Sequence, residues 1–133
     1  MKTKLFTWVL KLFFIAVVIF LLLEAAHQKE VMKDSQESIY QLQQGLQECY
    51  DETFYYPIGQ NMSGATLADN LIKQNISFEV PTNPLTGKKL ILGEEDNIIY
   101  SSRENGDRFL LQAFYKDKLI YELDQGADGQ AKL

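Results

Sequence analysis

Side chains that commonly carry catalysis or bind metals are few and scattered in this sequence. His27 is the single histidine and Cys49 the single cysteine, so neither an internal disulfide nor a His/Cys cluster of metal-binding spacing can form. His27 closely follows an apolar run, where a solvated polar role is favoured over a catalytic pair. Cys49 falls on the apolar face of an expected helix, which favours a small core residue over a nucleophile.

The acids and glycines do not form a recognisable active site either. The glycines at 59, 64, 87 and 93 lack the spacing of a phosphate-binding loop. Five acids lie in turns between expected strands, where acids are typical solubilising residues: Glu94, Glu95, Asp96, Glu104 and Asp107. The sequence therefore predicts a protein that is not an enzyme, and it indicates no small-molecule substrate.

The chain is organised around an uncharged apolar run at residues 12–23. With residues 5–10, and with Lys11 extending its amine toward the interface, the run reaches roughly 19 residues, close to the length of a membrane-spanning helix. Lys2 and Lys4 precede it and no acid does, which predicts a cytoplasmic amino terminus. We expect residues 1–23 to be a basic segment and a single transmembrane helix, with residues 24–133 outside the cytoplasm.

A cleaved signal peptide shows a similar pattern, with a basic start and a short apolar core. Ala25 or Ala26 would end such a peptide, but Leu23 or Glu24 would then stand where a small residue is needed. The pattern favours a retained anchor, and the cleaved form stays open as the alternative.

Length and charge limit what lies beyond the anchor. The 133 residues allow one further domain, large enough for a modest single core. The first 23 residues carry a formal charge of +3 and the remainder −8. An acidic exterior argues against a nucleic-acid partner.

Residues 24–52 are expected to continue the helix, since no proline interrupts them. Gly45 lies within this helix, where it marks either a close backbone approach or a tolerated weakness. Apolar and small residues recur every three or four positions and predict a narrow stripe that another element must cover: Val31, Ser35, Ile39, Leu42, Leu46, Cys49 and Tyr50.

The second half of the chain predicts a small antiparallel sheet. Residues 53–89 form a variable region with a short helix at 63–74 and a strand-like piece at 76–80. Residues 90–124 contain three β-branched or aromatic runs, at 97–102, 109–116 and 119–123, separated by the turns Asn105-Gly106 and Asp117-Lys118. Residues 125–133 close the chain as a loop. The expected fold class is α+β, a long amino-terminal helix packed on an antiparallel sheet.

The order of these parts resembles the pilin-like proteins, and among them the type II secretion major pseudopilins. The resemblance rests on FTWV at 6–9, LQQGL at 42–46 with Tyr56-Pro57 after it, NPLTG at 83–87 and GADGQ at 126–130. It extends over nearly the whole chain. It implies a pilin-like fold and a bacterial inner-membrane protein with other pilin-like or secretion-system subunits as partners.

The sequence departs from the family where family precursors are processed. The glycine that precedes the prepilin peptidase cut is replaced by Leu5, and the glutamate at the fifth mature position by Leu10. The resemblance therefore implies a chain that escapes cleavage and amino-terminal methylation.

The resemblance also implies a calcium site, with Asp124 and Asp128 as candidate ligands. The resembled proteins complete this site in a Gly- and Asp-rich stretch, whereas the sequence here ends Ala131-Lys132-Leu133. Two acids are few for a cation that takes six to eight oxygens, so a solvated acidic turn is favoured and no other cofactor is expected.

We therefore expect a membrane-anchored structural or interaction protein of a type II secretion or type IV pilus-type assembly. Its expected helix contacts, for which exposure to lipid is the alternative role, are Phe6, Phe13, Phe14, Val17 and Phe20. The alternative function is a tethered binding or sensor domain, whose site would use aromatic residues that otherwise belong to the core: Tyr55, Tyr56, Tyr100, Phe114, Tyr115 and Tyr121.

Overall fold

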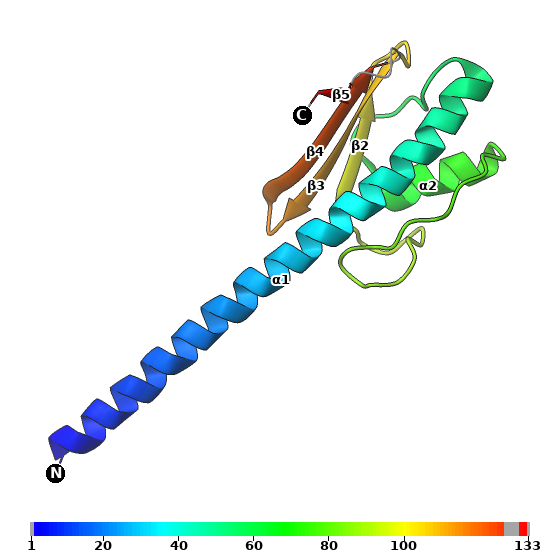
Figure 1. Ribbon diagram of the computed structural model, residues 1–133. Coiled ribbons are helices and arrows are strands. Elements are labelled where there is room, and N and C mark those ends of the chain that lie inside the picture. The colour runs from blue at the N-terminus through cyan, green and yellow to red at the C-terminus, as the bar shows by residue number, and fades with distance from the viewer. Residues whose placement is uncertain (1, 127–130, 133) are drawn as a thin grey trace. The chain divides into compact units, whose positions relative to one another are not determined.

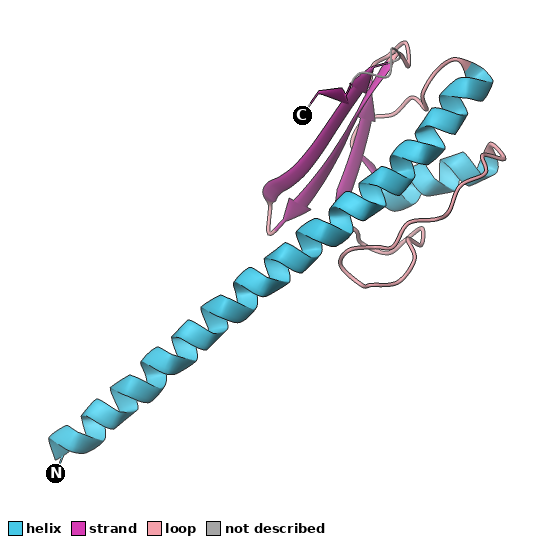
Figure 2. Cartoon of the chain, in the orientation of Figure 1, coloured by secondary structure: helices cyan, strands magenta, loops and turns pink. Residues whose placement is uncertain are grey.

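The computed structural model describes residues 2–126 and 131–132. The chain begins with one long helix, α1 (Lys2–Thr53), and continues with a short strand and a second helix, β1 (Met62–Ser63) and α2 (Gly64–Lys73). The remaining strands are β2 (Ile98–Ser102), β3 (Arg108–Tyr115), β4 (Lys118–Gly126) and β5 (Ala131–Lys132) (Figures 1 and 2). The expected α+β class, a long helix with a small antiparallel sheet, is confirmed.

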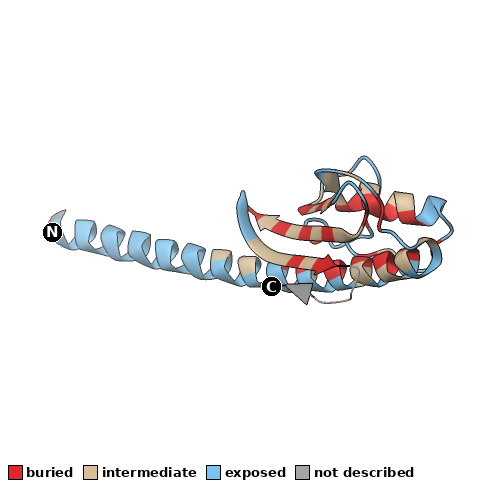
Figure 3. Ribbon diagram, turned by 90° about the horizontal axis from the view of Figure 1, so that it is seen from above, coloured by how far each residue is buried: buried red, intermediate tan, exposed pale blue. Residues whose placement is uncertain are grey.

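Contacts divide the chain into two compact units, Met1–Glu30 and Val31–Leu133. The described residues of the first unit, 2–30, are all helical, and the side chains from Thr3 to Leu23 are exposed. The second unit contains the rest of α1, α2 and the whole sheet. In Figure 3 the buried residues accordingly lie in the second unit.

The sheet of the second unit has the strand order β1-β2-β3-β4-β5, and every neighbouring pair is antiparallel. Buried and half-buried residues alternate along β2 and β3, because successive side chains of a strand point to opposite faces. The register pairs Tyr100 with Leu111, and Leu111 in turn with Leu123. One face of the central strands is thus supplied with large apolar side chains.

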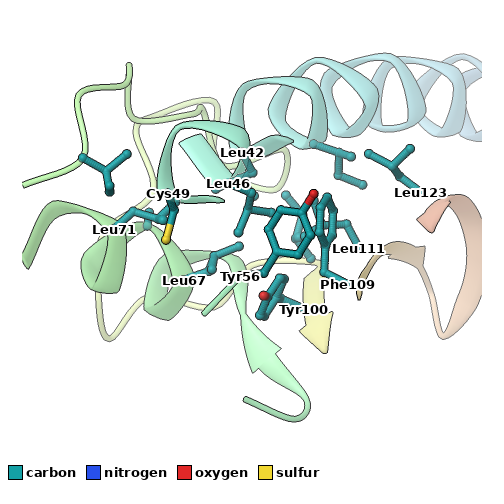
Figure 4. Close-up of a cluster of buried hydrophobic side chains, with 14 of the residues drawn as sticks. Leu42, Leu46, Cys49, Tyr56, Leu67, Leu71, Tyr100, Phe109, Leu111 and Leu123 are labelled. Atoms are coloured by element: carbon teal, nitrogen blue, oxygen red, sulfur yellow. The ribbon is translucent and has the colours of Figure 1, made fainter. Parts of the chain in front are cut away.

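That face is covered by α1 and α2. Leu42 and Leu46 of α1 are fully buried, and the apolar stripe predicted on this helix is confirmed. Figure 4 shows the resulting cluster, in which side chains from both helices meet those of the strands. Its labelled members are Leu42, Leu46, Cys49, Tyr56, Leu67, Leu71, Tyr100, Phe109, Leu111 and Leu123.

Gly45 lies where α1 meets the segment after α2. A Cβ at Gly45 would come within 3.0 Å of both Leu71 Cδ1 and Phe78 Cγ. Of the two roles that the sequence allowed for this glycine, the close approach is therefore the one observed.

The prediction of a strand at residues 76–80 is wrong. Ile76 is buried and Phe78 half-buried, so the alternation that suggested a strand is real. The segment, however, joins no strand of the sheet: the Ile76 amide donates to the Leu71 carbonyl, and Phe78 packs against the core cluster beside Gly45. Alternate residues of the segment are buried because their side chains pack against the helices.

Candidate functional site

The first unit presents an uninterrupted apolar surface. α1 is the one helix among the described residues that is long and apolar enough to cross a membrane, and none of its apolar window is buried. A helix that is hydrophobic on all sides is stable in water only when something else covers it. A signal sequence has the same length and composition, so both expectations stated for this segment fit the observation.

The five expected contact residues are all exposed, at fractions from 38% for Val17 to 69% for Phe14. At about 100° per residue, Phe6, Phe13, Val17 and Phe20 fall within about 60° of one another around the helix. Phe14 lies about 100° away from Phe13 on the same scale. Four of the five residues therefore form one stripe, and Phe14 lies beside it.

Lys11 is the one charge inside the apolar span, and it avoids this stripe. By the same rotation it lies about 160° from Phe13 and shares a face with Thr7 and Phe14. Helical side chains lean toward the amino terminus, so the Lys11 amine is directed toward the basic end of the segment. The phenylalanine stripe is left free of charge.

The candidate calcium ligands are only partly described. Asp124 lies on β4, and its Oδ1 accepts a hydrogen bond of 2.8 Å from Arg108 Nε on β3. Its carboxylate is thus already paired with a cation. Asp128 lies outside the described residues. Within residues 2–126 and 131–132 there is no group of three His, Cys, Asp or Glu side chains placed to hold a metal ion.

A cluster of glutamines that the sequence analysis did not single out fixes the end of β4 to α1. Gln125 is 3% exposed. Its Oε1 accepts from Gln43 Nε2 at 2.5 Å, and its Nε2 donates to Gln47 Oε1 at 3.2 Å. The hydroxyl of Tyr56 donates to the next carbonyl, that of Gly126, at 3.4 Å. Gln43 and Gln47 lie one helical turn apart, and this spacing is the sequence signal for the cluster.

Cys49 is fully buried in the core cluster, as expected. Burial raises the pKa of its thiol above the usual 9.0, an effect that the hydrogen bond with Thr53 opposes and the charge of Glu52 reinforces. Its Sγ lies 3.4 Å from Gln74 Oε1 and 3.7 Å from the Tyr55 carbonyl. A protonated, enclosed thiol of this kind is a poor nucleophile.

The aromatic residues proposed for a binding site do not gather around one cavity. Tyr56 and Tyr100 are fully buried and pack on Phe109, with ring centroids 4.7 and 6.0 Å from it. Tyr55 is half exposed, near the end of α1. Phe114 and Tyr115 line a separate hollow that also includes residues 95–97, and Tyr121 packs against the core from β4. Core packing accounts for most of the set.

The fold and exposed helix define a small α+β protein with an amino-terminal apolar segment able to cross a membrane. No family model, curated protein or solved structure matches the chain.

Proposed function

We propose that this chain is a pseudopilin-like structural protein, anchored in a bacterial inner membrane by residues 5–23. Its amino terminus is cytoplasmic, and it associates with pilin-like subunits of a type II secretion or type IV pilus-type assembly. The observation that carries the proposal is the contrast within α1. One half of this helix is exposed and apolar on all sides, and the other half is the central element of a small folded unit.

The exposed half of α1 supplies the surface for this contact. The stripe of Phe6, Phe13, Val17 and Phe20 is free of charge and long enough for side-by-side helix packing. Between helices in lipid, association depends on close packing rather than on the hydrophobic effect. A stripe of rings along one side of the helix provides the shape for such packing, whereas the face with Lys11 suits the lipid interface.

Phe13 and Phe14 make a matched pair for testing this contact. They are neighbours of the same residue type with nearly equal exposure, 67% and 69%, but only Phe13 belongs to the stripe. We expect a photo-reactive phenylalanine analogue at position 13, in cells, to crosslink to another protein with an amino-terminal apolar helix. The same analogue at position 14 should label lipid.

Equal crosslinking from the two positions, or lipid adducts alone from both, would contradict the contact. In that case the tethered binding domain would remain as the alternative. Identification of the adduct by mass spectrometry distinguishes a pilin-like subunit from an unrelated membrane protein.

The proposal also makes a statement about processing. With Leu5 before Phe6 and Leu10 at the position of the family's glutamate, the mature chain should retain residues 2–5. We expect amino-terminal sequencing of membrane-extracted protein to begin at Met1 or Lys2. A chain that begins at Phe6 would mean that the peptidase accepts leucine, and a soluble chain that begins after Leu23 would replace the anchor with a signal peptide.

A further inference from the structure

The segment after α2 runs back along α1 in a nearly extended conformation. Phe78 packs beside Gly45, and the Thr82 carbonyl accepts a hydrogen bond from the Ser38 hydroxyl. Gly45 and Ser38 are seven residues apart, which is about 10 Å along the helix. The four steps from Phe78 to Thr82 must therefore advance about 2.5 Å each, closer to the rise of a strand than to that of a helix. Residues 76–80, drawn as loop in Figure 2, thus form an extended segment.

The backbone of this segment has no partner strand. Within the described residues, the amides and carbonyls of residues 77–80 form no hydrogen bond. The amides of an extended chain point alternately to its two edges. Because the Ile76 amide donates to Leu71 of α2, the amides of Ser77 and Glu79 point to the edge away from α2. An unpaired edge of this kind is a template for another extended chain.

That edge borders an open hollow, which we call the α1 groove. One wall is α1 between Gln36 and Glu48, and the other is residues 77–79. Neighbouring side chains of an extended chain point to opposite sides, so three consecutive lining residues place the backbone between them in the wall as well. The α1 wall is about 18 Å long, which five or six residues of an extended chain would span. The volume of about 680 Å³ is in the range of ligand sites.

The α1 groove is acidic. Glu37, Glu48 and Glu79 are among the residues that line it, and no lysine or arginine is. All three glutamates are exposed, and none belongs to an ion pair in the part of the chain that the structure describes. Lys33, one turn before Glu37, lies outside the lining, and Lys73 is already in a salt bridge within α2. A segment that fills the groove must therefore supply the positive charge.

We propose that the α1 groove binds an extended basic segment of a partner protein. The bound segment pairs its backbone with Ser77 and Glu79 and places lysine or arginine side chains beside the three glutamates. Strand addition of this kind gains affinity from main-chain hydrogen bonds and specificity from side chains. Tyr40 also lines the groove and is 60% exposed, so its ring can support a cationic side chain. All these groups lie in the second unit, and the inference does not depend on the membrane anchor.

The first experiment measures how the full chain in detergent micelles binds a fluorescein-labelled peptide in which three lysines alternate with two valines. Fluorescence anisotropy gives the affinity. Binding should weaken about tenfold when the three acids of the groove are neutralised together. The substitutions are Glu37→Gln, Glu48→Gln and Glu79→Gln.

A control variant removes the same charge from exposed glutamates that do not line the groove. Its substitutions are Glu94→Gln, Glu95→Gln and Glu104→Gln, and its affinity should stay within about twofold of the parent. Near-ultraviolet circular dichroism of the tyrosines, all of which lie in the second unit, verifies that each variant is folded. Equal weakening in the two variants, or no binding to the parent protein, overturns the inference.

The second experiment separates strand pairing from attraction between charges. Two further peptides keep all three lysines and carry backbone N-methyl groups, one on the two valines and the other on two of the lysines. Because an added strand uses only one of its edges, one methylated peptide should bind at least about tenfold more weakly than the other. Equal binding of the two would reduce the contact to electrostatics and overturn the strand addition.

Hydrogen exchange of the full chain, followed by nuclear magnetic resonance, identifies the edge that is used. Saturation with the unmethylated peptide should slow exchange at least about tenfold at the Ser77 and Glu79 amides and leave the Phe78 and Val80 amides unchanged. Unchanged exchange at all four amides overturns the pairing. Slower exchange at Phe78 and Val80 alone overturns the assignment of the edge that faces the groove.

Discussion

The two halves of α1 differ in apolar content and have opposite environments: 17 of the 19 residues at 5–23 are apolar, against 8 of the 20 at 31–50. From Leu5 to Leu23 the apolar residues surround the helix and all are exposed. From Val31 to Tyr50 most of them form one largely buried stripe, and only Met32 and Tyr40 are exposed. The two halves therefore differ both in how many apolar residues they contain and in how those residues are arranged around the helix. A helix polar on one side can be covered by a sheet, whereas one apolar on every side requires a surrounding apolar medium.

Replacing Leu46 with Asp should have the largest effect on this contrast. Leu46 is fully buried, and an unpaired carboxylate there costs several kcal/mol against the roughly 5–15 kcal/mol that keeps a domain folded. We expect the tyrosine near-ultraviolet signal to be lost while membrane extraction stays unchanged. A retained signal would mean that α1 does not form the core of the second unit.

The same substitution in the first half should have the reverse outcome. Val17→Asp places a carboxylate near the middle of the apolar run, where insertion becomes about 2.5–3.5 kcal/mol less favourable. The protein should shift toward the soluble fraction on flotation while its tyrosine signal persists. Unchanged flotation would contradict the membrane-spanning role.

Enlarging Gly45 sharpens the comparison at the level of packing. Gly45→Val should destabilise the second unit by about 1–3 kcal/mol, because a Cβ at this position would already lie 3.0 Å from Leu71 Cδ1 and from Phe78 Cγ. Urea unfolding monitored by tyrosine measures the change. Ala16→Val, on the exposed half, is the matched control and should have no effect on this transition. The loss of unfolding free energy caused by Gly45→Val should be smaller in a Leu71→Ala background. An equal loss in both backgrounds would mean that the valine does not clash with Leu71.

Removing Gln125 tests how β4 is held to α1. Gln125→Ala leaves the half-buried amides of Gln43 and Gln47 without this partner and should cost about 1–3 kcal/mol. Gln44→Ala, on the exposed side of the same helix turn, should stay within about 0.5 kcal/mol of the parent protein. Equal effects in urea unfolding would show that the amide cluster contributes nothing specific.

The smallest effect concerns Cys49. Because burial raises the pKa of its thiol, the folded state favours the protonated form. The associated stability is present below the usual pKa and is lost as the pH rises above it. We expect the free energy of unfolding to fall less steeply between neutral pH and pH about 10 in Cys49→Ala than in the parent. Iodoacetamide should label the parent quickly only once it is unfolded.

Sequence patterns predict most of the elements because their signals are local. The stripe on α1, the helix α2 and the three main strands each follow from spacing and turn chemistry within a few residues. Ser35 shows that position in the helical repeat can predict burial better than residue type does. It is polar, but it falls in the stripe and is fully buried. Its Oγ donates to the Val31 carbonyl and accepts from Asn97.

What could not be predicted depends on partners distant in sequence. From the sequence alone, Asp124 is a candidate calcium ligand. The register of β3 and β4 places Arg108 beside it, so its carboxylate is paired with a guanidinium group instead. Gln43, Gln47 and Gln125 read as surface residues until β4 is placed against α1. The strand expected at 76–80 failed for the same reason: a pattern of burial does not say which element provides the cover.

The core unites residues that are made at different times. Leu46 and Leu111, which meet in the core cluster, are 65 positions apart. At about 5–20 residues per second the ribosome needs roughly 3–13 s to pass from one to the other. During that interval the stripe on α1 has left the ribosome and its cover has not been synthesised. We therefore expect a chaperone or the translocation channel to cover the apolar stripe of the nascent chain. Slow codons between residues 50 and 111 would lengthen the exposure of the stripe and should increase degradation of the chain by proteases.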